Sequence, residues 1–279
     1  MSDNLGYIEI IPNRYTEKEK WDMAVGLQQI DNLTPSSYLE QLMDENISGK
    51  ITVQQVEKGL RTYYEERNKN NKIDYNEYEC DFVSLRIVEL LNKKDFELSM
   101  DYLKYIHKYL FQDIFSDAGE FKKKNYIKKE PILNRDTVIY GEFKVIKESL
   151  EYDISNEKKK NYKSMSINYL IENIAKFSSS IWQIHPFKEG NTRTVAVFVQ
   201  KYLIDMGYNV DNSLFKDKSL YYRNALVRSN YYNNDLNIKE DNSYLIKFYE
   251  NLLLGKNNNL KTEDEIVKEL FKEDLWKRK

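Results

Sequence analysis

The chain has 279 residues, enough to bury a sizeable core in one large domain or two small ones. Its 43 lysines and arginines nearly balance 45 aspartates and glutamates, and the net charge of −2 argues against general nucleic-acid binding. The single cysteine, Cys80, excludes an internal disulfide, and neither a run of eighteen apolar residues nor a basic-then-apolar leader occurs. We therefore expect a cytoplasmic protein that does not bind membranes.

Composition also predicts an all-α fold. Nine glycines and four prolines are too few for a sandwich of many strands, and helix-forming residues recur at helical spacing. A capping box at Thr16–Glu19 predicts a first helix to about Ile30. Two more helices are predicted, from Ser36 to Met43 and from Thr52 to about Tyr64, before a polar linker at residues 68–72.

That linker suggests a division of the chain. Residues 1–70 would form an N-terminal helical extension, residues 75–254 a core, and residues 255–279 a linker followed by a C-terminal helix. Apolar residues at helical spacing predict these core helices: Tyr78–Asn92, Leu103–Phe115, Ile167–Ile181, Val195–Met206, Ser219–Tyr232 and Ser243–Leu254. The third and fourth have the broadest apolar faces, so we expect them to be the most deeply buried.

The pattern changes between residues 126 and 140. Residues 131–140 predict two short β runs about a polar turn, which together would make a hairpin. A connecting hairpin without a partner is the alternative to a functional one. The lysines around it are solvated or, if they face a pocket, steer an anion, and the sequence does not decide between these readings: Lys122, Lys123, Lys124, Lys128 and Lys129.

Nine residues, His185–Arg193, link the two most apolar helices and combine several groups suited to phosphate chemistry. Gly190 lets the backbone approach a ligand closely, and the N–H groups of the helix start behind it attract an anion. Arg193 can hold phosphate oxygens with a bidentate fork, and Glu189 is a ligand of the kind that Mg²⁺ takes singly. His185 can accept a proton near neutral pH. The other histidine, His107, has no such neighbours, and we interpret it as structural.

The segment HPFKEGNTRT resembles the signature loop of the Fic family, His-x-Phe-x-Asp/Glu-Gly-Asn-x-Arg, and matches it without a gap through Arg193. The resemblance implies a Fic-type helical bundle with a short β-hairpin flap over the active-site loop. It also implies a nucleotidyltransferase, a protein adenylyltransferase that moves AMP from Mg-ATP to a Tyr, Ser or Thr hydroxyl of a target protein or of itself. By the same resemblance His185 and Arg193 are catalytic, as base and phosphate clamp, Glu189 is the Mg²⁺ ligand, and Asn191 binds the α-phosphate.

The resemblance implies further site residues outside these four. For nucleotide binding they are Lys188, Glu189, Gly190, Asn191, Thr192 and Arg193, with Tyr221, Tyr222 and Asn230 from the helix over residues 219–232, whose register no strict motif fixes. In the family the flap holds the target's backbone by strand addition. The matching target-docking residues here would be Ile132, Leu133, Thr137, Val138 and Ile139.

Two departures from the family pattern stand out. Many members carry a second arginine three residues after the first, and here that position is Ala196. Related proteins are held inactive by the signature Ser/Thr-x-x-x-Glu-Gly/Asn in a helical extension, whereas Leu27-x-x-x-Asp31-Asn32 and Gln41-x-x-x-Glu45-Asn46 come nearest here and lack the hydroxyl. We therefore favour an ordinary packing role for residues 1–70 over a regulatory one.

Two alternative functions stay open. The transferred group could be phosphate, UMP or phosphocholine instead of AMP, or the chain could be a non-catalytic helical module of the toxin-antitoxin type. P-loop and Rossmann motifs are absent from the sequence, so neither explains nucleotide binding. The expected partners are ATP and a protein with an accessible hydroxyl; the sequence leaves the target's identity and a homodimer open.

Overall fold

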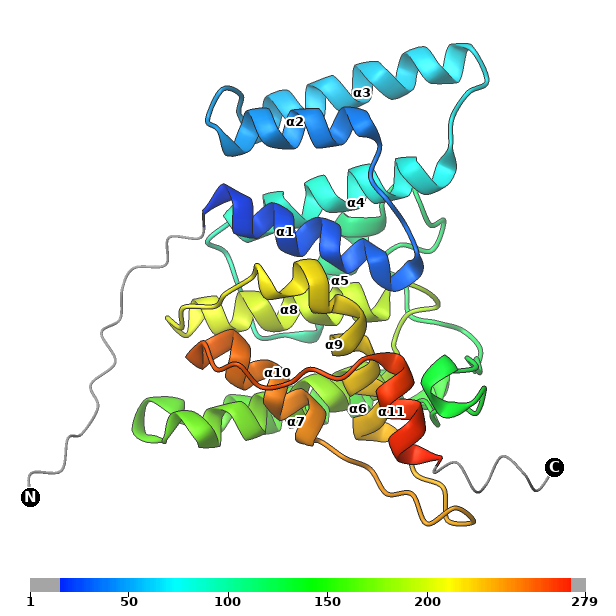
Figure 1. The fold of residues 1–279 in the computed structure, drawn as a ribbon, viewed down its shortest axis with the longest axis vertical. Coiled ribbons are helices and arrows are strands. Elements are labelled where there is room, and N and C mark those ends of the chain that lie inside the picture. Colours follow the sequence, from blue (N-terminus) through cyan, green and yellow to red (C-terminus); the bar gives the residue numbers. More distant parts are fainter. Residues whose placement is uncertain (1–15, 272–279) are drawn as a thin grey trace, which may run out of the picture.

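The structure is a computed structural model that describes residues 16–271. Within that range it is helical, as predicted, and its helices stack in layers along the long axis of the molecule (Figure 1). The helices are α1 (Glu17–Gln28), α2 (Ser37–Ile47), α3 (Val53–Lys69), α4 (Tyr75–Asn92), α5 (Met100–Phe111), α6 (Ile146–Lys158), α7 (Ile167–Ile184), α8 (Asn191–Asp205), α9 (Leu214–Asn230), α10 (Ser243–Leu254) and α11 (Glu263–Leu270). None of these described helices is long and apolar enough to cross a membrane.

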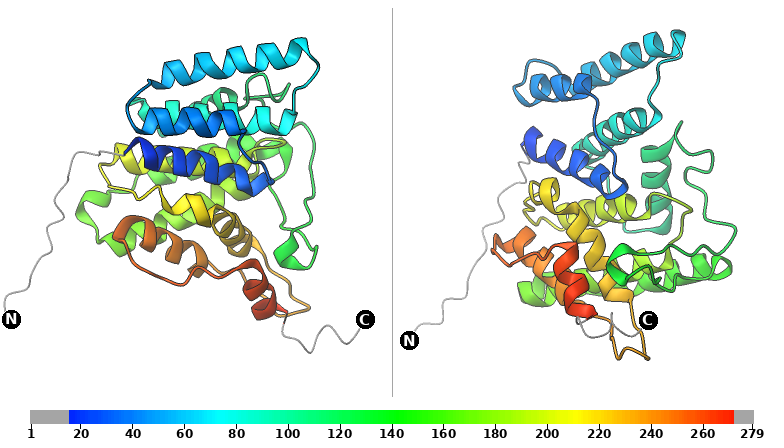
Figure 2. Two further views of the ribbon diagram at one scale, coloured as in Figure 1. Left: turned by 45° about the horizontal axis from the view of Figure 1, so that its top comes forward. Right: turned by 45° about the vertical axis from the view of Figure 1, so that its right-hand side comes forward.

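The layers follow a clear order (Figures 1 and 2). The α2–α3 pair forms one end and packs on α4, and α1 lies beside α4 in the next layer. Helices α5 and α8 occupy the middle, α8 packs on α7, and α9 packs against α1, α7 and α10 toward the other end. Helix α1 therefore packs into the body of the molecule between α4 and α9.

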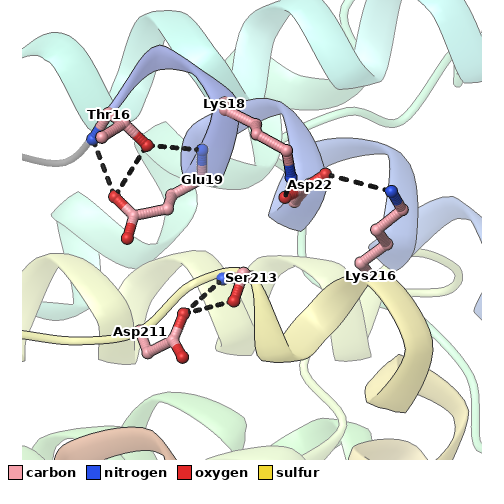
Figure 3. A network of polar contacts seen from close by, with 7 residues as sticks. All are labelled: Thr16, Lys18, Glu19, Asp22, Asp211, Ser213 and Lys216. Carbon is pink, nitrogen blue, oxygen red and sulfur yellow. Dashed lines mark hydrogen bonds and ion pairs between the residues drawn. The ribbon is translucent and has the colours of Figure 1, made fainter.

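Polar contacts fix the start of α1 and its position on α9 (Figure 3). The Thr16 hydroxyl accepts a hydrogen bond from the Glu19 N–H at 3.2 Å, and the Glu19 carboxylate accepts one from the Thr16 N–H at 2.7 Å. This is the capping box that the sequence predicts. One turn later Asp22 pairs with Lys18 of the same helix and, at 3.7 Å, with Lys216 of α9.

A glycine allows α1 and α9 to touch. A Cβ at Gly26 would lie 2.2 Å from the carbonyl oxygen of Phe215, so only glycine permits this backbone approach. The fully buried Trp21 lies on the same helix, and its indole N–H donates to the Asn46 side chain of α2 at 2.8 Å. The N-terminal helices are thus tied to one another as well as to the core.

A buried carboxylate joins the α2–α3 pair to α4. Asp81 of α4 has no exposed surface and accepts hydrogen bonds from the Ser36 N–H at 2.9 Å, the Ser36 hydroxyl, and the Tyr64 hydroxyl at 2.8 Å. Burial raises the pKa of Asp81 to about 6 even though these hydrogen bonds favour the charged form. Burying a carboxylate costs free energy unless it is hydrogen-bonded. The bonds to Asp81 therefore favour one position of the α2–α3 pair on α4.

Helices α7 and α8 form the centre of the core. Their inward faces are fully buried at Leu170, Ile174, Ala175, Ile181, Val197, Phe198 and Leu203. The sequence predicted this burial from the broad apolar stripe on each helix. Because α7 ends at Ile184 and α8 begins at Asn191, the six residues between them are held at both ends by buried helices.

The predicted β-hairpin over residues 131–140 is wrong. The described residues contain no strand, only an isolated bridge between Asn233 and Ile238, and Pro131–Leu133 form a 3₁₀ turn, η2. Pro131 suits the first position of such a turn, and Asn134 and Arg135 both adopt positive φ angles, 52° and 67°, which curl the chain instead of extending it. The Arg135 N–H then donates to the Glu130 carbonyl at 3.0 Å and closes the turn.

Candidate active site

The connection between α7 and α8 is a sharp loop with two left-handed residues. His185 ends α7 with φ 51°, and Gly190 precedes α8 with φ 71°. A Cβ at Gly190 would lie 2.4 Å from a ring carbon of Phe111 on α5. Glycine is therefore required at this position by both conformation and space.

The loop is closed by its own side chains. Asn191 is 3% exposed; its Oδ1 accepts from the Phe187 N–H at 2.9 Å and its Nδ2 donates to the Phe187 carbonyl at 2.8 Å. The Trp182 indole N–H donates to the Thr192 hydroxyl at 2.9 Å. The side chain of Asn191, which we expected to bind phosphate, therefore holds the loop in shape.

His107 supports the loop from below. The Gly119 N–H donates to its Nδ1 at 2.8 Å, so Nε2 carries the proton and donates to the Glu189 carbonyl at 3.1 Å. The imidazole also stacks on Phe187 with ring centroids 3.8 Å apart. Burial lowers the pKa of His107 to about 4, which keeps the ring neutral. The structural role predicted for this histidine fits these contacts, which place it directly beneath the signature loop.

The loop opens onto a pocket of about 250 Å³. It is lined by His185, the residues Lys188–Thr192, and Asp31, Tyr126, Ile127, Lys128, Tyr140, Trp182 and Arg223. Three cationic side chains, those of Lys128, Lys188 and Arg223, share this lining with two carboxylates, those of Asp31 and Glu189. Of the pattern residues predicted to bind nucleotide, all except Arg193 face the pocket.

His185 sits in the pocket wall in a form that can accept a proton. Its ring stacks on Tyr140 with centroids 3.9 Å apart and meets the edge of Trp182 at 5.9 Å. Burial, together with the nearby charges of Lys122, Lys128 and Arg223, lowers the pKa of His185 to about 3. Its Nδ1 is buried and has no hydrogen-bond partner within residues 16–271. The imidazole is therefore neutral at pH 7.

Arg193 does not face the pocket. It is 2% exposed, and its guanidinium donates to Gln28 at 2.7 Å and to Glu79 at 2.8 Å, and pairs with Asp31 at 3.0 Å. The guanidinium also lies over the Phe111 ring at 4.8 Å. The residue that we expected to clamp phosphate is thus occupied by side chains of α1, of the 3₁₀ turn η1 (Gln29–Asp31) and of α4.

The three residues predicted from α9 lie away from the pocket. Tyr221 and Tyr222 pack in the core against Phe248 of α10, and the Asn230 amide donates to Leu226 at 2.8 Å. We revise that part of the prediction, because the helical period turns these side chains away from the signature loop. The α9 residue that does line the pocket is Arg223, which the sequence analysis missed.

Arg223 is joined to the segment before α6. It is 6% exposed and pairs at 2.6 Å with Glu130, which has no exposed surface and also accepts a hydrogen bond from the Tyr140 hydroxyl at 3.1 Å. The sequence offered one signal for Arg223, its charge among the apolar and aromatic neighbours of residues 220–227. Its partner, Glu130, is ninety-three positions away. The lysine run divides in the structure: Lys122 is buried, Lys128 lines the pocket, and the others are exposed.

The residues predicted to dock a target are mostly inaccessible. Ile132, Leu133 and Val138 are at most 2% exposed, and the first two are buried within the 3₁₀ turn. Thr137 is half-buried, and Ile139 is 63% exposed. The segment still lies over the site, since Tyr126, Ile127, Lys128 and Tyr140 form one wall of the pocket.

The pocket has the ligands that a nucleotide-bound Mg²⁺ needs from a protein. No group of three or more His, Cys, Asp or Glu side chains gathers around a metal position in the described part of the chain. Mg²⁺ commonly takes one or two protein carboxylates and completes its shell with substrate phosphates and water. Glu189 faces the pocket in an exposed position, with Asp31 also in the lining, so the residues present fit that mode.

Comparison with known families agrees with this geometry. Residues 97–203 match the family model for the Fic/DOC family, and this stretch includes α5, α7, most of α8 and the whole signature loop. The chain carries a Fic/DOC-family domain. Over 140 residues it is 24% identical to the protein adenylyltransferase VbhT of Bartonella schoenbuchensis. That match covers 50% of this chain but only 28% of the relative.

One solved Fic structure supports the fold, and a second gives a lower score. The crystal structure of BepC from Bartonella tribocorum, which contains bound AMPPNP, superposes with a TM-score of 0.51 at 19% identity, over 64% of this chain and 85% of that one. The N-terminal Fic domain of a putative cell filamentation protein from Bartonella quintana gives a TM-score of 0.49 at 20% identity, over 64% and 81%. The likeness to BepC supports the Fic-type helical arrangement predicted from the signature loop.

Proposed function

We propose that the protein transfers AMP from Mg-ATP to a Tyr, Ser or Thr hydroxyl of a target protein. The observation that carries this proposal is a neutral His185 at the edge of a pocket whose floor is the N-terminus of α8. The N–H groups of Asn191, Thr192 and Arg193 have no hydrogen-bond partner in the described chain. Together with Lys128, Lys188 and Arg223 they make a site for a polyanion.

In the proposed reaction His185 acts as general base. The target hydroxyl oxygen attacks the α-phosphorus and forms a new P–O bond, its proton moves to the imidazole, and the bond from the α-phosphorus to pyrophosphate breaks. A bound nucleotide places negative charge near His185, which raises its pKa from the low value of the free protein and strengthens it as a base. Stacking on Tyr140 keeps the ring facing the pocket.

Glu189 is the residue that would hold Mg²⁺. The ion supplies neutralisation of the phosphate charge when it is bound with the nucleotide. Glu189 has no ion-pair partner among residues 16–271, and its carbonyl is fixed by His107, so its backbone is held while its carboxylate stays available.

We further propose that the N-terminal helices restrain this site. Arg193 is drawn toward Gln28, Asp31 and Glu79, and Asp31 itself lines the pocket. Asp31 ends η1, and Asn32 follows it in the left-handed conformation with φ 57°. Asp31, in one of the two near-signatures, therefore pairs with Arg193 of the loop, whereas the Glu45 carboxylate in the other accepts a described hydrogen bond only from Gln41 of its own helix. This argues for a regulatory role of residues 1–70, which we had ranked second.

Isotope position tests which group is transferred. Full-length protein is incubated with a protein extract and with ATP labelled at the α- or the γ-phosphate. AMP transfer predicts covalent label from α-labelled ATP alone, and loss of that label in His185→Ala. Label from the γ position alone would instead show phosphorylation, and label from UTP or CDP-choline would show a different donor. If nothing is transferred but Mg-ATP still binds, the non-catalytic module takes precedence.

A further inference from the structure

A second hollow adjoins the candidate active site. It has a volume of about 630 Å³ and lies between residues 139–141, helix α6 and helix α7. Tyr140 lines both this hollow and the nucleotide pocket, so the two cavities meet at this residue. A chain lying across Tyr140 would therefore contact both. We call the hollow the docking groove.

The groove and the pocket differ in charge. Glu148 and Asp153 of α6 are the charged residues in the groove lining, and no cation lies in it. Within residues 16–271 neither carboxylate takes part in an ion pair. Burial raises the pKa of Asp153, and the charge of Lys160 opposes this rise only in part, so the carboxylate is partly desolvated. The pocket, in contrast, presents Lys128, Lys188 and Arg223.

The rim of the groove is apolar and exposed. Ile139 is 63% exposed and Tyr152 is 70% exposed, and both line the groove. Large exposed side chains around a hollow are typical of a binding surface. The rim and the two carboxylates together suit a long side chain with an apolar stem and a cationic head, as lysine and arginine have.

Backbone groups along one wall are also available. The Gly141 N–H donates to the Gln183 carbonyl at 2.9 Å, and the Gln183 amide donates to the Ile139 carbonyl at 3.3 Å, which anchors this wall to α7. The N–H groups of Ile139 and Tyr140 have no hydrogen-bond partner in the described residues. An extended segment of another protein could accept bonds from them without displacing existing ones.

We propose that the docking groove binds a basic segment of the target protein, with a lysine or arginine side chain between Glu148 and Asp153. The same segment places its hydroxyl residue across Tyr140, beside His185. This inference rests on the proposed transferase function, which it deepens by assigning the target a positive charge near the modified hydroxyl. The expected occupant follows from the charge of the lining and from the continuity of the groove with the pocket.

Direct binding tests the groove without relying on catalysis. The probes are fluorescein-labelled ten-residue peptides with one central tyrosine. One set carries two lysines or arginines on one side of the tyrosine, and the other carries glutamates at the same places. Fluorescence anisotropy measures the affinity of each peptide for the full-length protein. We expect the basic peptides to bind at least tenfold more tightly than the acidic ones. We expect the double substitution Glu148→Gln/Asp153→Asn to remove that preference.

Matched controls separate the groove from general electrostatics. The double substitution Glu142→Gln/Glu151→Gln removes the same charge from two exposed neighbours outside the groove lining, and it should leave the preference intact. Ser180→Trp should fill the groove and weaken basic peptides without altering charge. An equal loss in both double variants, or no loss in the groove variant, would overturn the proposal.

Two further measurements on the same proteins, Mg-ATP binding and α-label transfer, test the proposed transferase function independently of the groove. The groove variants should bind Mg-ATP as the unsubstituted protein does, because neither carboxylate lines the nucleotide pocket. Absence of label transfer with selective basic-peptide binding would refute the transferase and leave the groove. Transfer to basic and acidic peptides at equal rates, with equal affinities, would refute the groove and leave the transferase.

Discussion

The two ends of the signature loop lie in opposite environments. His185 and the residues Lys188–Thr192 face an open pocket, and neither Lys188 nor Glu189 is ion-paired within residues 16–271. Arg193, one position further, is 2% exposed and is held by three polar side chains from two other parts of the chain. A complete sequence motif thus combines residues that face an open pocket with an arginine, expected to bind phosphate, whose guanidinium is already held by other side chains.

Helix geometry explains the difference. Asn191 and Thr192 open α8, and their N–H groups point toward the pocket, whereas the Arg193 side chain leaves the next face of the helix and enters the space between α1 and α4. A guanidinium buried there needs partners, which Asp31 and Glu79 supply while the Phe111 ring lies beneath it. The two halves of the loop can therefore be broken separately.

The largest effect should come from removing the base. His185→Ala should lower α-label transfer by about 10²–10⁴-fold, because no other histidine is present except His107, which is engaged beneath the loop. Thermal unfolding should change little, since His185 makes no side-chain hydrogen bond within the described residues. Undiminished transfer by a well-folded variant would remove His185 from the mechanism.

The next largest effect is expected at Gly190, which precedes α8. Gly190→Ala puts a Cβ into the Phe111 ring at a positive φ and should destabilise the protein by roughly 2–4 kcal/mol, measured by urea unfolding. Gly49→Ala is the matched control, because its φ of 76° is similar but no atom lies within 4 Å of the added carbon. It should cost only about 1 kcal/mol. Equal costs at the two positions would show that contact with Phe111 is unimportant.

A smaller effect is expected on the pH dependence of stability, through His107, which contacts the signature loop. The pKa of His107 is about 4 in the folded protein against about 6.5 unfolded, so the unfolded chain binds the proton more tightly and stability falls as pH drops from 7 toward 4. His107→Gln removes this term. The unfolding free energy of the unsubstituted protein should therefore fall by about 2 kcal/mol more than that of the variant between pH 7 and pH 5.

Other groups that titrate in this range are common to both proteins. Asp81 acts in the opposite direction, since its raised pKa makes the folded state bind the proton first and gain stability as pH falls through about 6. His185 acts in the same direction as His107. Both terms cancel in the difference between the two curves, so parallel curves would mean that His107 titrates normally.

The elements with long apolar stripes could be predicted, and those that depend on distant partners could not. The pattern over Ser243–Leu254 matches α10, and the capping box at Thr16 marks the start of α1. Helix α6 was not predicted, because its apolar positions are few and it packs against α5 and α7, which are distant in the sequence or follow it. The hairpin failed because two positive-φ residues in succession, Asn134 and Arg135, wind the chain into a turn that propensity alone does not show.

The site divides in the same way. His185, Glu189 and Gly190 could be located from the sequence, since all three lie in one continuous motif, and the structure places all three in the pocket lining. The surroundings of Arg193 could not, because Gln28, Asp31 and Glu79 are more than a hundred positions away. Ala196, which marks the missing second arginine, is 1% exposed. An arginine at this position would have to bury its charge, so the described packing does not accommodate the family's second arginine.

The smallest effect is expected from weakening the ion pairs that hold Arg193. Asp31→Asn keeps the shape of the side chain but removes one of the two negative charges on Arg193, while Gln28 and Glu79 remain. Asp31 is one-third exposed, so the gain should be modest, about threefold to tenfold in Mg-ATP affinity by calorimetry and in α-label self-modification. Glu45→Gln is the control, because Glu45 belongs to the other near-signature but its carboxylate accepts a described hydrogen bond only from Gln41, and it should change neither quantity. If Asp31→Asn lowers ATP affinity instead, then Asp31 serves the pocket as a ligand-binding carboxylate and the N-terminal helices do not restrain Arg193 through it.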